Sequence, residues 1–433
     1  DAGVDGPIVM LGAGLGYHLF AMSELYPDRR IICVDARPHM LKESMREFDW
    51  SLLLGRGGFE LFCPGADEGF TPPDDARIFM HPVLFGHDLE YYYRFLRLMR
   101  APAPGGKLRV MSFMTRGSLV PHTLEDIHST LREMGHDVHV VDLSGVSRER
   151  EFDDAVRRGA LDYCPDFVIT VDAVGLSEEV LGGLGVPVVS WFFDNPLGIL
   201  AFGDGEEGAR PGLLGECYKV YSWDEYYVEP LESRGVRAEY LPLAANPSVF
   251  SRVECGGAEM ERYGANVSFV GTGRRAADSE YRRGCVESLG GLGVKLWGDG
   301  WEDLRGGGFE FMGRADNRNE TPKIFSSSKI NLSFSTGQIV TGLPMRVFDI
   351  LACGGFLLSD YRSDIDRLFG PGAGPAVFKS ALELRGRVEY YLENPDERER
   401  IALAGRNAVL ERHTFRHRME KILRDTFGDD IDA

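Results

Sequence analysis

A glycine turn that leads into a helix gives this chain a candidate site for a phosphate group. Thr341 and Gly342 precede Pro344, and the apolar spacing of the next residues predicts a helix from about Arg346. The first N–H groups of a helix have no partner within it and attract anions. Asp349 lies in the first turns of this helix, where a carboxylate can accept hydrogen bonds from ribose hydroxyls. The pattern therefore indicates a site for an anion and a ribose.

The residues around this turn support its placement. Gly354 and Gly355 end the predicted helix with a left-handed cap, and the apolar run Phe356–Asp360 predicts a buried parallel strand. Arg346 and Asp349 lie three residues apart and share one helix face, so Arg346 either contacts a diphosphate or forms a salt bridge with Asp349. An ordinary packing helix would explain the apolar positions alone, and this alternative stays open.

The stretch Asp349-Ile-Leu-Ala-Cys353-Gly354 resembles the nucleotide-sugar motif of two-domain (GT-B) glycosyltransferases, in particular the spore-maturation CgeB-like branch of glycosyltransferase group 1. Further stretches in the family's order extend the resemblance over roughly residues 107–425: Met134–Val140, Leu241–Phe250 and Arg398–Met419. The resemblance implies an α/β fold of GT-B architecture, with two Rossmann-like domains facing a cleft and closing helices that cross back to brace the first. It also implies a nucleoside diphosphate sugar, of UDP or GDP type, as donor.

The resemblance assigns the donor contacts to the back half of the chain. The residues it places at the donor are Gly271, Gly273, Arg274, Arg275, Thr341, Gly342, Arg346 and Asp349. In the family, the first of these loops carries a basic residue that neutralises the departing diphosphate, and a fixed guanidinium suits that role. We expect Arg275 to make this contact, with Arg274 as its substitute. A surface salt-bridge cluster with Asp278 and Glu280 is the open alternative.

Two positions depart from the family's motif. Asp349 stands where the family has a glutamate for the ribose, and Thr341 replaces a second glutamate, eight residues earlier, that faces the donor sugar. A threonine hydroxyl can still hydrogen-bond a sugar hydroxyl. The departure leaves open a non-catalytic scaffold that binds a nucleotide or a partner.

In the middle of the chain, polar residues follow predicted strands of a parallel sheet, at the edge where ligands of such sheets bind. The candidates on this acceptor side are Arg116, Gly117, His122, Asn195 and Asp224. The segment Phe193–Pro196 looks like the family's own loop, so we expect Asp194 to contact the acceptor or the donor sugar. Asp194 and Arg275 are the two expected catalytic residues. A simple turn at Asp194 and Pro196 is the alternative.

The chain divides into three predicted α/β units: an accessory domain (1–104), an acceptor-side domain (105–248) and a nucleotide-sugar domain with closing helices (249–433). In the first unit, Gly12, Gly14 and Gly16 follow a strand, and Asp35 ends the next one, as in ribose-binding Rossmann units. This loop resembles those of methyltransferases and of MptE-like domains. Met10 replaces the usual methyltransferase acid and the unit is short, so we expect an accessory domain. The alternative is bound S-adenosylmethionine, with Asp35 on its ribose.

Composition narrows the remaining classes of function. The formal charge of −19 over 433 residues disfavours nucleic acid and anionic membranes as partners. The sequence shows neither a transmembrane run nor a basic leader, and its seven scattered cysteines suit reduced thiols in a cytoplasm. No cluster has metal-ligand spacing, and capping explains Asp364-Ile-Asp366. We expect His413 and His417 to be solvated.

Together with these observations, the resemblance implies a bacterial, cytoplasmic glycosyltransferase (a hexosyltransferase-like enzyme of class EC 2.4). It would act without a metal and, as in its relatives, with retention of configuration. The acceptor is open among a cell-surface glycan, a lipid and a protein. Two alternatives remain beside it, namely the non-catalytic scaffold and an S-adenosylmethionine-dependent methyltransferase.

Overall fold

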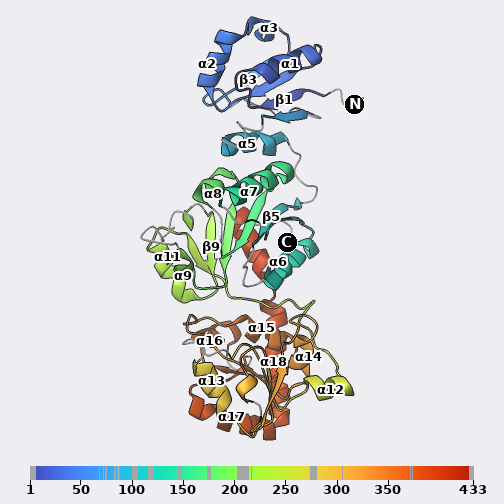
Figure 1. The fold of residues 1–433 in the computed structure, drawn as a ribbon, viewed down its shortest axis with the longest axis vertical. Helices are drawn as coiled ribbons and strands as arrows, with labels where there is room; N and C mark the ends of the chain where they lie inside the picture. Colours follow the sequence, from blue (N-terminus) through green and yellow to red (C-terminus); the bar gives the residue numbers. More distant parts are fainter. Residues whose placement is uncertain are drawn as a thin grey trace.

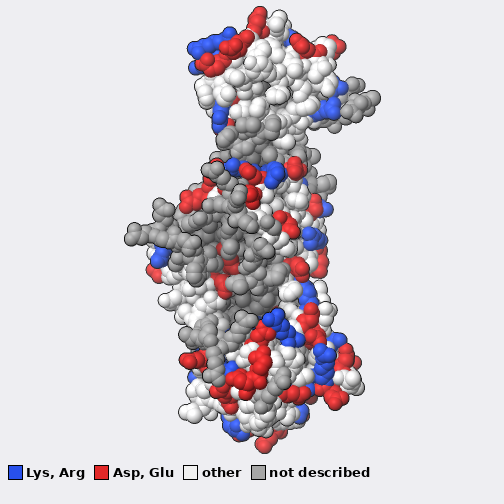
Figure 2. Space-filling model, viewed as in Figure 1, with Lys and Arg blue, Asp and Glu red and all other residues white. Residues whose placement is uncertain are grey.

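The computed structural model describes residues 6–428, apart from 68, 72, 74–75, 82–83, 85–87, 100–105, 116–120, 145, 147–148, 173–176, 202–213, 216, 274–279, 305, 371 and 373. Three parallel sheets, each covered by helices, follow one another along the long axis of the molecule (Figure 1). Acidic and basic side chains are interspersed on the face shown in Figure 2. The α/β fold expected from the sequence is confirmed. Within the described residues, no helix combines the length and apolar character needed to cross a bilayer.

The N-terminal domain is a four-stranded sheet of order β3-β2-β1-β4. Its two central strands, β1 and β2, are short apolar runs that are buried throughout, as parallel strands covered on both faces should be. Its elements are β1 (Ile8–Leu11), α1 (Tyr17–Leu25), β2 (Ile31–Val34), α2 (Pro38–Glu47), α3 (Ser51–Leu54), β3 (Phe59–Phe62), β4 (Arg77–Met80) and α5 (Leu89–Met99). Helix α5 lies between this sheet and the middle domain (Figure 1).

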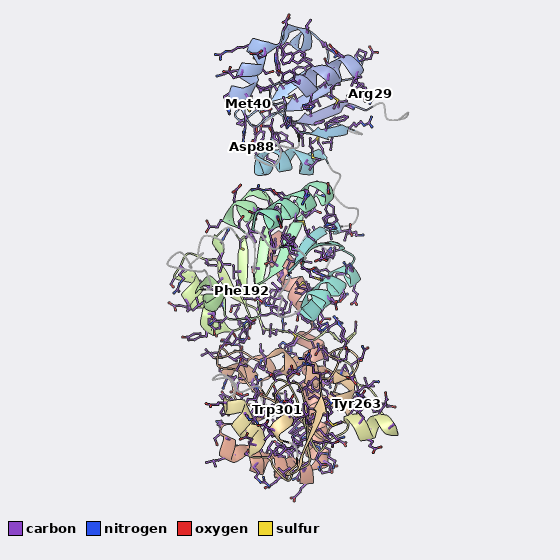
Figure 3. All side chains as sticks on the ribbon, in the orientation of Figure 1. Arg29, Met40, Asp88, Phe192, Tyr263 and Trp301 are labelled. Carbon is purple, nitrogen blue, oxygen red and sulfur yellow. The ribbon has the colours of Figure 1, made fainter. Side chains whose placement is uncertain are left out.

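The middle domain is a six-stranded sheet of order β10-β9-β8-β7-β5-β6. Its elements are β5 (Arg109–Thr115), α6 (Pro121–Glu133), β6 (Asp137–Leu143), α7 (Glu149–Tyr163), β7 (Phe167–Val171), α8 (Glu178–Gly183), β8 (Val188–Phe192), α9 (Pro196–Ala201), β9 (Lys219–Ser222), η2 (Glu225–Tyr227), α11 (Val228–Glu232) and β10 (Ala238–Tyr240). Phe192, the last residue of β8, lies in the part of this domain nearer the C-terminal domain (Figure 3). The residues after β8 therefore approach the junction of the two domains.

The C-terminal domain is a second six-stranded sheet, of order β13-β12-β11-β14-β15-β16. Its elements are α12 (Ala258–Tyr263), β11 (Val267–Val270), α13 (Glu280–Glu287), β12 (Val294–Trp297), η3 (Glu302–Leu304), β13 (Phe309–Gly313), α14 (Thr321–Ser327), β14 (Ile330–Ser333), α15 (Met345–Ala352), β15 (Leu357–Asp360), α16 (Ser363–Phe369), β16 (Ala376–Phe378), α17 (Ala381–Glu393), α18 (Pro395–Arg412) and α19 (Phe415–Phe427). The strand order reverses between β11 and β14, and a crevice at such a point is where open α/β sheets bind ligands.

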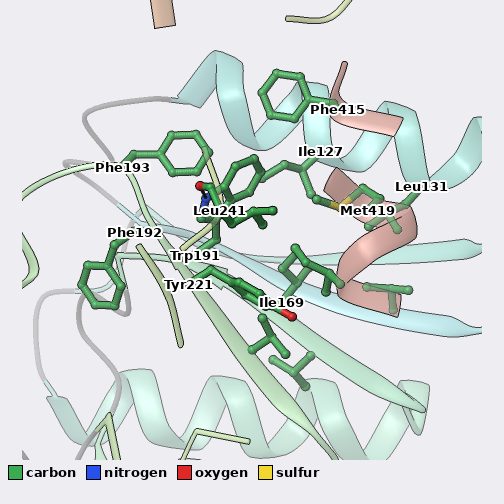
Figure 4. Close-up of a cluster of buried hydrophobic side chains, with 14 of the residues drawn as sticks. Ile127, Leu131, Ile169, Trp191, Phe192, Phe193, Tyr221, Leu241, Phe415 and Met419 are labelled. Atoms are coloured by element: carbon green, nitrogen blue, oxygen red, sulfur yellow. Dashed lines mark hydrogen bonds between the residues drawn. The ribbon is translucent and has the colours of Figure 1, made fainter. Parts of the chain in front are cut away.

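The last helix returns to the middle domain. Helix α18 packs on α15 of the C-terminal domain, whereas α19 packs on α6 of the middle domain. Figure 4 shows Phe415 and Met419 of α19 in one apolar cluster with Ile127 of α6 and Trp191 of β8. The chain crosses between the domains beside residue 245, where Ala245 N donates to His413 O and Phe415 N to Ala245 O. The closing helices thus cross back as the resemblance implied.

Arg418 stabilises this crossing through hydrogen bonds from a buried position. It is 6% exposed, and its guanidinium donates to the carbonyl oxygens of Pro242 (2.7 Å), Leu243 (2.9 Å) and Arg412 (3.0 Å). Its neighbour His413 is buried as well, with Nε2 3.0 Å from Leu368 O, so the expectation that His413 is solvated was wrong. Burial and the nearby Arg418 charge lower the pKa of His413 to about 4, which keeps its ring neutral.

Replacing Arg418 by methionine should lower the free energy of unfolding by about 2–4 kcal/mol, because three backbone carbonyls lose their donor, the buried one of Leu243 among them. Arg416 lies on the same helix with its side chain exposed, so Arg416→Met is the matched control and should change stability by less than about 0.5 kcal/mol. Thermal unfolding of both variants measures the difference. Equal midpoints would show that Arg418 does not hold the crossing.

Candidate functional site

A cavity of about 620 Å³ lies between the middle and C-terminal domains. On the C-terminal side it opens at the carboxyl ends of β11 and β14, the point where the strand order of that sheet reverses. On the middle side it meets the segments that follow β8 and β9. The lining residues are mostly apolar, and the charged ones among them are Asp194, Arg282 and Arg346.

The C-terminal wall of the cavity is cationic. Arg282, on α13, is 8% exposed, and its guanidinium donates to Thr272 O (3.1 Å) and lies 5.8 Å from the centroid of the Phe269 ring. The neighbouring Arg283 is instead paired with Asp303 and Glu287 and does not line the cavity. Pro344, Met345 and Arg346 bring the N-terminus of α15 to the same wall. Two guanidinium groups and a helix N-terminus together make a site for a polyanion.

Asp349 lies behind Arg346 and does not line the cavity. Its side chain is almost fully buried, with Oδ2 3.6 Å from Arg346 Nη1, and among the described residues its Oδ1 has no hydrogen-bond partner. Burial raises the pKa of Asp349 to about 8, although the Arg346 charge opposes this rise. Arg346 also stacks near Phe325, 5.7 Å from its ring centroid. The geometry thus joins the two residues in a pair in which Arg346 faces the cavity, and it does not place Asp349 where a ribose would be.

Asp194 brings a carboxylate to the cavity from the middle domain. Its Oδ1 accepts a hydrogen bond from Gln338 Nε2 of the C-terminal domain at 2.7 Å. Its backbone is held by Asp172, whose Oδ1 accepts from the N–H groups of Phe193 (2.8 Å) and Asp194 (3.3 Å). Asp172 is itself buried and adopts a left-handed φ of 58°. The segment after β8 is therefore anchored from two directions.

Other predicted residues serve the contact between the domains and lie away from the cavity wall. Asp224 is fully buried and accepts hydrogen bonds from Thr341 N (3.1 Å), from the Thr341 hydroxyl and from Val340 N (2.8 Å). A Cβ at Gly342 would lie 3.0 Å from the Trp223 ring, so glycine is needed for the close approach of the domains. Thr341, Gly342 and Asp224 thus form a buried interdomain contact.

Three more predicted residues have structural surroundings. A Cβ at Gly273 would lie 2.3 Å from the Trp301 indole, whereas Gly271 does line the cavity. Asn195 caps α9 through Leu197 N (2.9 Å). His122 is exposed, and its carbonyl accepts from Arg318 (3.1 Å) away from the cavity. The predicted residues Arg274, Arg275, Arg116 and Gly117 lie outside the described residues.

In the N-terminal domain, His81 and Leu84 pack against the corresponding glycine loop. A Cβ at Gly12 would lie 3.1 Å from both His81 and Leu84, and one at Gly14 would lie 3.2 Å from Leu84. Asp35 is fully buried, and its Oδ2 accepts from the N–H groups of Ala13 (2.7 Å) and Gly14 (3.2 Å). Burial raises the pKa of Asp35 despite these bonds. Asp35 therefore holds the glycine loop of residues 12–16 through its Oδ2, and the alternative of S-adenosylmethionine at this loop stays a prediction.

No group of three or more potential metal-ligating side chains occurs among the described residues. The Asp364 carboxylate of the Asp-x-Asp pair instead accepts a hydrogen bond from the Tyr240 hydroxyl (2.6 Å), and burial raises the pKa of Asp364 to about 6.

Comparison with solved structures identifies the architecture. Residues 275–424, about a third of the chain, match a family model described as glycosyl transferase-like. Sucrose-phosphate synthase from Thermosynechococcus elongatus is similar at a TM-score of 0.55 and 14% identity, over 74% of this chain and 99% of that one. The fold is that of the GT-B glycosyltransferases.

Further matches agree with this fold. HepE from Anabaena, solved with UDP and glucose, is similar at a TM-score of 0.50 and 11% identity, over 73% of this chain and 99% of HepE. A putative UDP-N-acetylglucosamine 2-epimerase from Listeria monocytogenes is similar at a TM-score of 0.50 and 13% identity, over 73% of this chain and 95% of that chain. No curated protein sequence matches. At these identities the structural matches establish the fold and leave the reaction open, and the CgeB-like and MptE-like assignments stay predictions.

The sequence analysis did not select Arg282, Gln338 or Asp172. Arg282 lies in the first turn of the helix after the Gly271 loop, a position that the βα pattern could have suggested. Gln338 belongs to a segment between β14 and α15 that carries no periodic pattern. Its contact with Asp194 joins residues of two domains, which no local signal reveals.

Asp172→Asn should stabilise the protein at pH 8 by about 1–3 kcal/mol. Burial, with the nearby Asp194 charge, raises the pKa of Asp172 to about 6 in the folded state, above the unfolded value of about 3.9. The free energy of unfolding therefore falls as the pH rises from about 4 to about 6, because the unfolded carboxyl ionises before the folded one. The loss is complete above about pH 6 and absent below about pH 4. Asparagine keeps the acceptor oxygen and tolerates the left-handed backbone, so its advantage should disappear at pH 4.

The control for this pair is Asp172→Ala, which removes the acceptor from two buried N–H groups and should destabilise the protein at both pH values. Thermal unfolding between pH 4 and pH 8 compares the three proteins. A pH-independent difference between the asparagine variant and the wild type would contradict the assignment.

Proposed function

We propose that this protein is a glycosyltransferase that moves a sugar from a UDP- or GDP-type donor to a hydroxyl acceptor. One observation carries the proposal, namely the cavity at the C-terminal switch point. Among the described residues, two arginines and a helix N-terminus form one wall of this cavity, and the Asp194 carboxylate of the middle domain lies on the opposite wall. A departing nucleoside diphosphate gains negative charge in the transition state, and fixed cations stabilise that charge. The structural similarity to HepE, which was solved with UDP and glucose, supports the same ligand class.

In this proposal the diphosphate lies against Arg282, Arg346 and the first turn of α15. Gly271 and Thr272 offer backbone at the end of β11, where a phosphate can approach closely. Arg274 and Arg275 remain candidates for the same group. Asp349 supports Arg346 from behind, in place of the expected ribose contact. Because the two guanidinium groups carry the charge that a divalent cation would otherwise supply, we propose a reaction that needs no metal.

Asp194 is the proposed catalytic residue on the opposite wall. Its carboxylate can accept a hydrogen bond from a hydroxyl of the acceptor or of the donor sugar, and its position at the domain junction suits either. We propose retention of configuration, with the acceptor open among glycan, lipid and protein. No disulfide joins the seven cysteines in the described part of the chain, which agrees with the cytoplasm as the proposed location.

The non-catalytic scaffold remains the second candidate because of Thr341. The family's glutamate at this position faces the donor sugar, whereas the Thr341 hydroxyl donates to the buried Asp224. Hydrolysis and transfer assays with UDP- and GDP-sugars separate the two functions. A nucleotide at 100 times its dissociation constant should stabilise the protein by about 2.7 kcal/mol in either case. Turnover that falls strongly in Asp194→Ala, to a residual rate that is still measurable, supports the enzyme.

Arg282→Met should weaken UDP binding by about 10- to 100-fold, because the charge-assisted contact with the diphosphate is lost while the aliphatic stem is kept. Calorimetric titration of the purified full chain measures this. Arg385 is an exposed arginine of the same domain that pairs with Glu389, so Arg385→Met is the control and should bind UDP like the wild type. Unchanged affinity for UDP in the Arg282 variant would show that the Arg282 guanidinium does not bind the diphosphate.

A further inference from the structure

The segment 335–341, between β14 and α15, contributes Thr336, Gln338 and Ile339 to the cavity wall and is held mainly by the other domain. Besides the contacts of Asp224 with Val340 and Thr341, the Tyr227 hydroxyl donates to Gln338 O at 2.6 Å. Within its own domain, Ser335 N donates to Asp360 Oδ1 (3.0 Å) at the start of the segment. The shape of this part of the cavity wall therefore depends on contact between the two domains.

Gln338 contacts the middle domain through both ends of its side-chain amide. Its Nε2 donates to Asp194 Oδ1 at 2.7 Å, and its Oε1 accepts from Asn195 N at 3.4 Å. These two partners define the orientation of the amide, because a carboxylate needs the NH₂ end and a backbone N–H needs the oxygen. Tyr227 holds the backbone of the same residue. The amide thus stands in a defined position against the proposed catalytic carboxylate.

We propose that Gln338 is a positioning residue that sets the Asp194 carboxylate for catalysis when the two domains are closed. The inference rests on the proposed function. The torsion that rotates a carboxylate is broad, so a fixed donor on one oxygen selects one orientation and leaves the other oxygen for a substrate hydroxyl. The donor belongs to the C-terminal domain and the carboxylate to the middle domain, so opening of the cavity separates them. Asp194 is then oriented only while the site is closed, which limits hydrolysis of the donor in the open state.

The test replaces Gln338 by methionine, which keeps the length of the side chain and removes the amide. Donor turnover and UDP affinity are measured for Gln338→Met, alone and combined with Asp194→Ala. Tyr240→Phe is the matched control, because it removes another interdomain hydrogen bond, to Asp364 Oδ2 at 2.6 Å, and touches neither Gln338 nor Asp194. All variants are made in the full chain.

We expect Gln338→Met to lower kcat by at least about tenfold while UDP affinity changes by less than about threefold. In the Asp194→Ala background, adding Gln338→Met should change kcat by less than about twofold, because its effect acts through that carboxylate. Tyr240→Phe should keep kcat within about threefold of the wild type.

Three results would overturn the inference: an unchanged kcat in Gln338→Met, an equal loss with and without Asp194, or a loss of the same size in Tyr240→Phe. A wild-type protein that binds UDP and turns over no donor contradicts the proposed function instead, and the inference fails with it. The two failures are distinguishable because the second appears before any variant is made.

Discussion

A buried carboxylate, Asp224, joins the two domains beside the cavity. Its side chain is shielded from water and accepts hydrogen bonds from two backbone N–H groups and one hydroxyl of the opposite domain. A buried charge is tolerated only where donors compensate for lost hydration, so separating the domains would change the environment of this group strongly. The segment 335–341 is therefore most stable while Asp224 is covered. Because that segment also carries Gln338, the same contact that closes the domains shapes the cavity wall and reaches Asp194.

The N-terminal and C-terminal sheets each contain a point where the strand order reverses, and the surroundings of that point differ between them. In the C-terminal sheet, the ends of β11 and β14 open onto a large cavity with two guanidinium groups. In the N-terminal sheet, the glycine loop after β1 retains its left-handed residues, yet His81 and Leu84 occupy the adjacent space and Asp35 accepts its N–H groups. A glycine motif thus indicates the conformation of the backbone. Whether that loop binds a ligand depends on the side chains that follow the neighbouring strands, here β2 and β4. The middle sheet contributes to the C-terminal cavity from the opposite side.

Local patterns predicted the fold well and the site in part. The apolar runs at β1, β11 and β15, and the glycine-capped helix α15, follow from periodicity and turn chemistry, and the resemblance supplied the crossing of the last helix. Of the site residues, Gly271, Asp194 and Arg346 do line the cavity, because each follows a strand end or begins a helix. Thr341, Gly342 and Asp224 meet one another across a domain interface, and Asp349 is covered by its neighbours. Neither packing depth nor interdomain contact is encoded in a short stretch of sequence, so these placements required the structure.

The charge on the C-terminal wall of the cavity is positive, whereas the net charge of the whole chain is negative. The protein carries a formal charge of −19, which repels a nucleoside diphosphate at long range, and salt screens that repulsion beyond about 10 Å. Within the cavity, the charged lining residues are two arginines and one aspartate, and the surrounding apolar walls reduce screening by water. Attraction of the donor therefore depends on contact with this wall and on the α15 N-terminus, with little help from the field of the whole protein. Such a site favours a ligand that fits between Arg282 and Arg346 over anions in general, because Arg282 is buried and both guanidinium groups are held by neighbouring side chains or backbone.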